Sequence, residues 1–420
     1  MALTRKQIAQ APSLARVQAN RTTPALTLQP RPQSSRLPEL DALRGLMLVG
    51  MTLTHLPTQA SHYSNQLLGF VSWAEGFVLL SAVLTGRVYS SILQQRSWRE
   101  VFERLWLRCA KLYGYHLGLL AVAFTVVAAI AVHTQKPALL GLLDFYLAHH
   151  ALAVGGSLLL LYCPPLLDIL PMYIAFLMLT PFLLGVGQRW GWKFVLAPSG
   201  LLWLAAQFGV RGLIHGFLVT HAAFPIPLQN LGSFDLFAWQ FLWIFGLWLG
   251  AGDSVRLLEW FESRWTIALA SLVAATFLIL RYQWLPQYIS HPVDQGNAWV
   301  LFDKWQLGVL RLLDFAALGV LFSALRPHIA NRLAWRPLVL LGKSSLEVFC
   351  IQVLFSFAAL CLVGDGAGVH WLYQSAIVAT TLSGMYALAW WRARPRNDDT
   401  PVLWTLGLEW PPEGKQISAR

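Results

Sequence analysis

Apolar segments long enough to cross a bilayer alternate along this chain with shorter polar loops. A further apolar segment, 141–167, is interrupted by glycine and proline pairs, so we expect it to be re-entrant or to lie on the membrane face. The pattern predicts an all-α, polytopic integral membrane protein with about ten transmembrane helices. The ten predicted spans are 40–57, 67–90, 112–132, 168–187, 194–210, 235–252, 265–283, 304–325, 337–361 and 371–391.

Composition and charge exclude a soluble protein. Of 420 residues, 56% are hydrophobic and only 12% are charged, which leaves too little polar surface for a water-exposed globule. Most of the 31 Lys and Arg residues fall on one side of the predicted spans, and this bias places both termini in the cytoplasm. Because this distribution accounts for the net charge of +11, we expect no nucleic-acid partner.

The two ends of the chain are polar and flank the membrane domain, 39–392. Residues 1–38 hold six basic residues and no acid, which predicts a disordered cytoplasmic tail. An organelle-targeting presequence is the alternative, because it would also be rich in Arg and poor in acids. Residues 393–420 form a second cytoplasmic tail. The four Cys residues and the pair His149-His150 lack metal-ligand spacing, so no metal site is expected.

The first predicted span carries an arginine and a histidine on one face. Arg44 and His55 are eleven residues apart, which brings them within about 20° of the same helix face and about 16 Å apart along the axis. Ionisable groups are costly in lipid and normally face a protein interior or a wet cavity. The alternative is an interfacial arginine and a core histidine that is simply hydrogen-bonded.

The second predicted span buries a carboxylate. Glu75 lies about 12 Å below the outer end of this span, and the short loop between the first two spans makes them antiparallel neighbours. We therefore expect a pair between Glu75 and His55, in which the carboxylate orients the imidazole. A structural hydrogen bond between the two helices is the alternative.

Two later spans also begin with charged residues. Lys304 and Arg311 are seven residues apart on one helix face, while Asp314 is placed to pair with Arg311. An unpaired Lys304 would attract an anion. Ser344 is placed to cap the ninth span, and capping alone is the alternative to an anion site there.

Residues 92–111 alternate aromatic and basic positions, which predicts a basic amphipathic helix on the inner membrane surface. Such a helix anchors a protein to lipid, or it lines a site for an anionic cytosolic ligand. The arginines expected at this inner rim, suited to phosphate, are Arg44, Arg87, Arg104 and Arg108.

Six short motifs in order resemble those of the membrane acyltransferase-3 superfamily, and most closely its OpgC-type family of osmoregulated periplasmic glucan succinyltransferases. The likeness extends over about 38–360. The chain departs from the family's usual residues at Thr54, Ala82, Asp314 and Gln352. The motifs are Arg44 with His55 and 75–81, then 37–45, 168–174, Trp239-Gln240 with 245–250, Asp303-Lys304 with 310–313, and 342–349.

The resemblance implies an enzyme of the bacterial inner membrane that moves an acyl group, typically succinyl, from cytosolic acyl-CoA to a glycan hydroxyl. His55 is then the catalytic histidine, with Glu75 as its partner. The donor is succinyl-CoA or acetyl-CoA, no cofactor is bound permanently, and the partners are the bilayer and a glycan. Whether the protein forms a homo-oligomer stays open. A transporter or a non-catalytic subunit of a glycan export system is the alternative. The expected substrate-binding residues are Arg44, Ser81, Arg87, Arg104, Arg108, Trp239, Gln240, Lys304, Arg311 and Gln352.

Overall fold

The computed structural model is helical throughout the residues that it describes. The chain divides into two units, Met1–Leu37 and Pro38–Arg420, and every element below belongs to the second. Within the described residues there is no strand, only an isolated bridge between Leu68 and Val71. The all-α prediction is therefore confirmed, while almost all of the two predicted tails lies outside the described residues. The described residues are 37–252, 255–284, 297–366 and 368–394.

The elements follow the apolar segments closely, with some divided into shorter helices. They are α1 (Pro38–His55), α2 (Ala60–Ser64), α3 (Trp73–Gln95), α4 (Trp98–Val122), α5 (Ala128–Thr134), α6 (Pro137–Leu142), α7 (Asp144–Ala148), α8 (His150–Leu158), α9 (Ile169–Trp190), α10 (Lys193–Gln207), α11 (Val210–Ala222), α12 (Leu236–Ala251), α13 (Val255–Phe261), α14 (Arg264–Ile279), α15 (Val309–Leu333), α16 (Arg336–Lys343), α17 (Ser345–Val363) and α18 (Trp371–Arg392).

Fewer than ten of these helices meet the length and apolarity of a membrane span. Five do so among the described residues: α3, the continuous helix Trp98–Thr134, α9, the helix Arg264–Tyr282, and α17. The pair α10 and α11, bent by 74°, makes a sixth if it is one span. Helix α12 has only 16 residues, and α1 carries three charged residues near its start. The count of ten spans is therefore not confirmed by length and composition.

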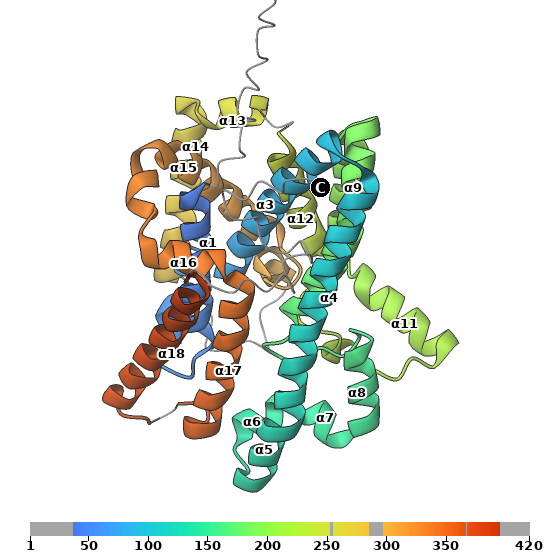
Figure 1. Cartoon of the computed structure of the whole chain (residues 1–420), viewed down its shortest axis with the longest axis vertical. Helices are drawn as coiled ribbons and strands as arrows, with labels where there is room; N and C mark the ends of the chain where they lie inside the picture. Colours follow the sequence, from blue (N-terminus) through green and yellow to red (C-terminus); the bar gives the residue numbers. More distant parts are fainter. Residues whose placement is uncertain (1–36, 253–254, 285–296, 367, 395–420) are drawn as a thin grey trace, which may run out of the picture. The chain divides into compact units, whose positions relative to one another are not determined.

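The bend between α10 and α11 explains why the predicted span 194–210 is short. Helix α10 ends at Gln207, and Gly209 takes a positive φ of 77°, which a residue with a side chain rarely adopts. The chain then turns into α11, which has no buried residue and points away from the other helices (Figure 1). Two elements thus replace one straight span.

Glycine contacts bring the helices of the molecular centre close together. A Cβ at Gly250 of α12 would strike the backbone of Val83 on α3, and one at Gly342 of α16 would strike Asp41 on α1. Small residues that allow such close backbone approach are typical of helix packing in membranes. These contacts fix α1 and α3, which carry the first two groups of interest, against the rest of the bundle (Figure 1).

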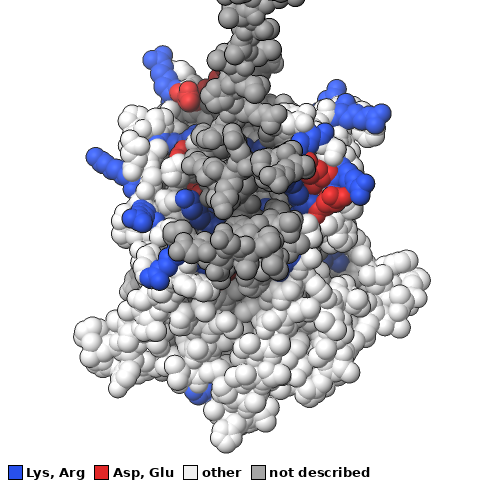
Figure 2. All heavy atoms as spheres, in the orientation of Figure 1, with Lys and Arg blue, Asp and Glu red and all other residues white. Residues whose placement is uncertain are grey.

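The basic segment 92–111 is not a separate helix. Helix α3 continues to Gln95, and α4 begins at Trp98 and runs past Lys111 to Val122. The π-helical turn Ala123–Val127 then joins α4 to α5. The segment is thus divided between two longer helices, and its position on the membrane surface stays a prediction. Figure 2 shows that Lys and Arg gather at the end of the visible face where α4 begins and α13 lies.

Candidate functional site

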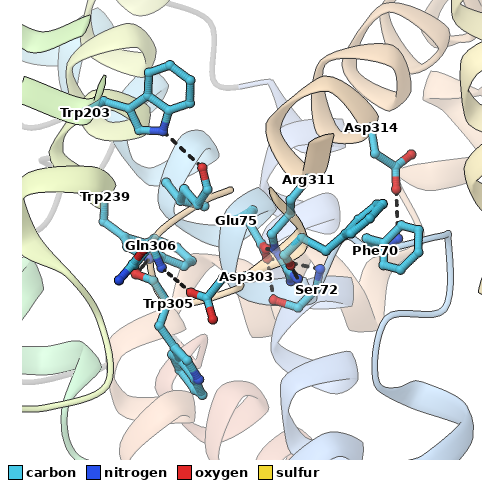
Figure 3. Close-up of polar contacts among 12 residues, drawn as sticks. Phe70, Ser72, Glu75, Trp203, Trp239, Asp303, Trp305, Gln306, Arg311 and Asp314 are labelled. Carbon is cyan, nitrogen blue, oxygen red and sulfur yellow. Dashed lines mark hydrogen bonds and ion pairs between the residues drawn. The ribbon is translucent and has the colours of Figure 1, made fainter. Parts of the chain in front are cut away.

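A buried ion pair joins the second span to the eighth. Arg311 Nε donates to Glu75 Oε1 at 2.5 Å, and both side chains are 1% exposed. Glu75 lies in the first turn of α3, where its other oxygen accepts hydrogen bonds from the backbone and the hydroxyl of Ser72 (Figure 3). Glu75 therefore neutralises Arg311, and the pair predicted between Glu75 and His55 is not formed.

Asp314 holds the turn before α3. It accepts a hydrogen bond of 2.8 Å from the backbone N–H of Phe70, so the predicted pair between Asp314 and Arg311 along α15 is replaced by two contacts to the α3 region (Figure 3). Gly69 enters this turn with a φ of 78°, and a Cβ there would meet the Asp314 carboxylate. The Asp314 carboxylate therefore contacts the turn at Gly69 and Phe70, and Arg311 pairs with Glu75 instead.

Lys304 lies in a loop, not in a helix. Because α15 begins at Val309, the prediction that Lys304 and Arg311 share one helix face is wrong. The Lys304 ammonium lies 4.6 Å from the centroid of the Trp305 ring. Burial lowers the pKa of Lys304, while the nearby carboxylates of Glu75 and Asp168 act in the opposite direction. A cation is thus held close to the Glu75–Arg311 pair.

Three side chains hold this loop through its backbone carbonyl groups. The Trp239 indole donates to Trp305 O at 3.0 Å, and the Trp203 indole donates to Leu307 O at 3.0 Å (Figure 3). Gln207 Nε2 donates to Gln306 O at 2.7 Å. The sequence singled out Trp239 but missed Trp203 and Gln207, since nothing in the sequence indicates which carbonyls an indole or amide will reach. Together they position Lys304.

His55, at the end of α1, has an amide as its partner. The distance between His55 Nδ1 and Gln352 Nε2 of α17 is 3.0 Å. Gln352 is fully buried, and its Oε1 has no hydrogen-bond partner among the described residues. The group that contacts His55 is therefore Gln352, which the sequence singled out as a departure from the family's usual residue and as an expected substrate-binding residue. A neutral side chain at this position gives no charge signal that could identify it.

A second cluster surrounds Arg44 and Arg108, two of the arginines predicted at the inner rim. Arg44 donates to the Ser345 hydroxyl and lies 5.8 Å from the centroid of the Phe77 ring. Arg108 donates to the Tyr173 hydroxyl at 3.2 Å. A narrow cavity of about 60 Å³ is lined by both arginines and both hydroxyl residues. Ser344 forms no side-chain cap, so the predicted helix cap is wrong.

The sequence profile of the OpgC protein family matches residues 36–397. This match covers most of the chain and includes every residue of both clusters. The protein belongs to the OpgC family. Family membership indicates a glucan-modifying membrane enzyme with a transferase role. No curated protein and no solved structure matches the chain.

Other residues singled out in this OpgC-family protein lie apart from the two clusters or contribute packing. Arg104 is paired with Glu100 at 2.6 Å, one turn away on α4. Gln240 exchanges hydrogen bonds with Ser199, its Nε2 donating at 2.9 Å to the backbone carbonyl. Ser81 is buried, with no partner for its hydroxyl among the described residues. Substrate contacts by these residues, and by Arg87, stay predictions.

Proposed function

We propose that this OpgC-family protein transfers an acyl group from acyl-CoA to a glycan hydroxyl across the bacterial inner membrane. The observation that carries the proposal is the arrangement of α1. Its Arg44 end belongs to an arginine cluster beside a cavity, and its His55 end belongs to a cluster with a buried amide and a nearby lysine. The rise of the helix separates these ends by about 16 Å.

The chemistry assigned to His55 is general-base catalysis. His55 Nε2 takes the proton of the acceptor hydroxyl while the hydroxyl oxygen attacks the thioester carbonyl carbon. The tetrahedral intermediate then collapses, the carbon–sulfur bond breaks, and the CoA sulfur leaves with the proton from His55. The products are an ester on the glycan and free CoA thiol. These reaction steps need no permanently bound cofactor.

Gln352 is the positioning residue for this base. A half-turn of its amide presents Oε1 to His55 in place of Nε2, and the two ends of the amide have nearly the same size. The Gln352 Oε1 then accepts a hydrogen bond from His55 Nδ1–H, which leaves the lone pair of His55 Nε2 to take the proton of the acceptor hydroxyl. The unpartnered, buried Oε1 supports this role.

Cationic groups at two places bind the two ends of the acyl-CoA donor. At the inner cluster, Arg44 and Arg108 bind the diphosphate of CoA through charge-assisted hydrogen bonds, with the pantetheine arm directed toward His55. At the other end, Lys304 meets either the free carboxylate of a succinyl group or the oxyanion of the intermediate. Arg311 contacts neither substrate in this proposal, since its charge is neutralised by Glu75.

The membrane topology of this proposal has ten spans and two cytoplasmic termini. It is supported by the positions of Lys and Arg along the chain and by their collection at one end of the face in Figure 2. The ten spans include α1, α12, α15 and α18, in addition to the longer apolar helices. Reporter fusions at positions 33 and 397 are both expected to give cytoplasmic signals.

Binding of acyl-CoA to the purified protein tests the proposed function. Isothermal titration with succinyl-CoA and acetyl-CoA is expected to show saturable binding to wild type. It is expected to show much weaker binding to Arg108→Gln. A protein that binds neither thioester, although folded, contradicts the proposal and favours a transporter or a non-catalytic subunit.

A further inference from the structure

A second, larger groove lies on a different face of α4. Its volume is about 570 Å³, and its walls come from α4, α17 and α18. This volume falls in the usual range for small-molecule sites. None of the residues that line the Arg44–Arg108 cavity also lines this groove. The groove is therefore separate from the proposed donor site, and the proposed function leaves it without a role.

One end of the groove is charged. Glu347 Oε1 accepts hydrogen bonds from Lys111 Nζ at 2.9 Å and from Arg392 Nη2 at 2.8 Å. Among the described residues, two cations therefore share one carboxylate at this end. Glu347 lies in the first turn of α17 and Arg392 is the last residue of α18, so the charges lie where these helices begin and end.

The rest of the groove is apolar and opens on the molecular surface. Gly114 and Gly118 of α4 lie one turn apart, both exposed, and a Cβ at either would meet no heavy atom within 4 Å. These glycines are thus not required by close helix packing. From Lys111 to Val122, α4 rises about 16 Å, which is the length of the groove along this helix.

We propose that this groove binds an anionic phospholipid. The phosphate lies against Lys111 and Arg392, and one acyl chain follows the channel that Gly114 and Gly118 leave on α4. Charge complementarity favours an anionic headgroup, while the long apolar part with an open side favours a lipid over a soluble phosphate. Tyr115 and Trp391 lie at the charged end, as aromatic residues do at membrane interfaces.

Retention of phosphatidylglycerol by the full-length protein, measured by native mass spectrometry after delipidation and titration, tests this inference. Wild type is expected to bind phosphatidylglycerol more tightly than phosphatidylcholine and to show no saturable binding of inorganic phosphate or glycerol phosphate. Gly118→Leu, which fills the channel, is expected to weaken phosphatidylglycerol binding at least about tenfold. Lys111→Gln is expected to weaken it about fivefold.

The matched control is Gly319→Leu on α15, where a Cβ also meets no heavy atom within 4 Å and which does not line this groove. This variant is expected to bind the lipid as wild type does. The inference is overturned if Gly118→Leu and Gly319→Leu retain equal amounts of lipid, or if both lipids bind wild type equally. Should Gly118→Leu fail to fold, Lys111→Gln decides by the same comparison. Because the readout is lipid retention, the outcome is independent of acyl transfer.

Discussion

The Glu75–Arg311 ion pair and the inner cluster around Arg44 and Arg108 hold charge differently. The ion pair is 1% exposed, and further hydrogen bonds fix its carboxylate. In the inner cluster Arg108 donates to the hydroxyls of Tyr173 and Thr85, and no ion pair joins it to a carboxylate among the described residues. The first arrangement fixes a structure, whereas the second leaves positive charge beside a cavity for an anionic ligand.

This difference assigns separate tasks to residues that look alike in the sequence. Arg311 and Arg108 are both arginines within long helices, yet Arg311 is paired with a carboxylate, whereas Arg108 donates to hydroxyl groups. Replacing Arg311 or Glu75 is expected to affect folding, while replacing Arg108 is expected to affect ligand binding.

The largest effect is expected from His55→Ala. Loss of a general base typically lowers the rate of transfer by about 10²–10⁴-fold. The variant should still insert in the membrane and bind acyl-CoA, because the inner cluster is unchanged. Acylation of a glucan acceptor, measured beside acyl-CoA binding, provides both readouts. Acylation close to the wild-type rate would remove His55 from the mechanism.

Breaking the buried ion pair is expected to destabilise the fold. Glu75→Gln leaves the Arg311 charge uncompensated in the interior, which typically costs about 3–5 kcal/mol. The thermal midpoint in detergent should fall clearly. The double variant Glu75→Gln with Arg311→Met should recover most of the loss, since it removes both charges. A single variant as stable as wild type would show that the pair does not stabilise the fold.

Arg108→Gln is expected to weaken acyl-CoA binding by roughly 10- to 150-fold, the equivalent of one charge-assisted hydrogen bond. The loss should be equal for succinyl-CoA and acetyl-CoA, because the contact is with phosphate. Arg99→Gln, which removes a highly exposed arginine on the same helix, serves as the control and should bind normally. Equal affinities of the two variants would contradict a phosphate site at the inner cluster.

Lys304→Ala is expected to reduce succinyl transfer about tenfold more than acetyl transfer, if the ammonium meets the free carboxylate. Burial lowers the pKa of Lys304, so its charge is lost at a lower pH than that of an ordinary lysine. The succinyl preference should therefore fade as the pH rises, and Lys304→Arg should keep it. Equal losses for both donors would instead assign Lys304 to the oxyanion, the acceptor or the fold.

The sequence predicted the class of fold and singled out some of the residues that the structure brings together, but not their pairing. Apolar periodicity identifies α3, α9 and α17 because their lipid-facing and core-facing positions are both apolar. It does not identify the partner of Glu75, since the choice between His55 and Arg311 depends on how α15 is rotated against α3. Nor does it show that Lys304 lies in a loop, because that follows from where α15 begins.

The contacts made by glutamine and tryptophan side chains are the hardest to predict from the sequence. Gln352 contacts His55 from a helix almost 300 positions later in the chain, and a neutral amide has many alternative partners. Trp203 and Gln207 act on backbone carbonyls, which are present in every residue and carry no sequence signal. Motif order located the region of the site, while the tertiary contacts decided which side chains position others.

In the proposed mechanism, the two ends of α1 serve a donor on one side of the membrane and an acceptor on the other. Proteoliposomes that enclose a glucan, with labelled succinyl-CoA added outside, measure this directly. In vesicles whose arginine cluster faces outward, we expect label on the enclosed glucan with wild type and almost none with His55→Ala. Label that appears only on glucan added to the CoA side, or equally with both proteins, would contradict this mechanism.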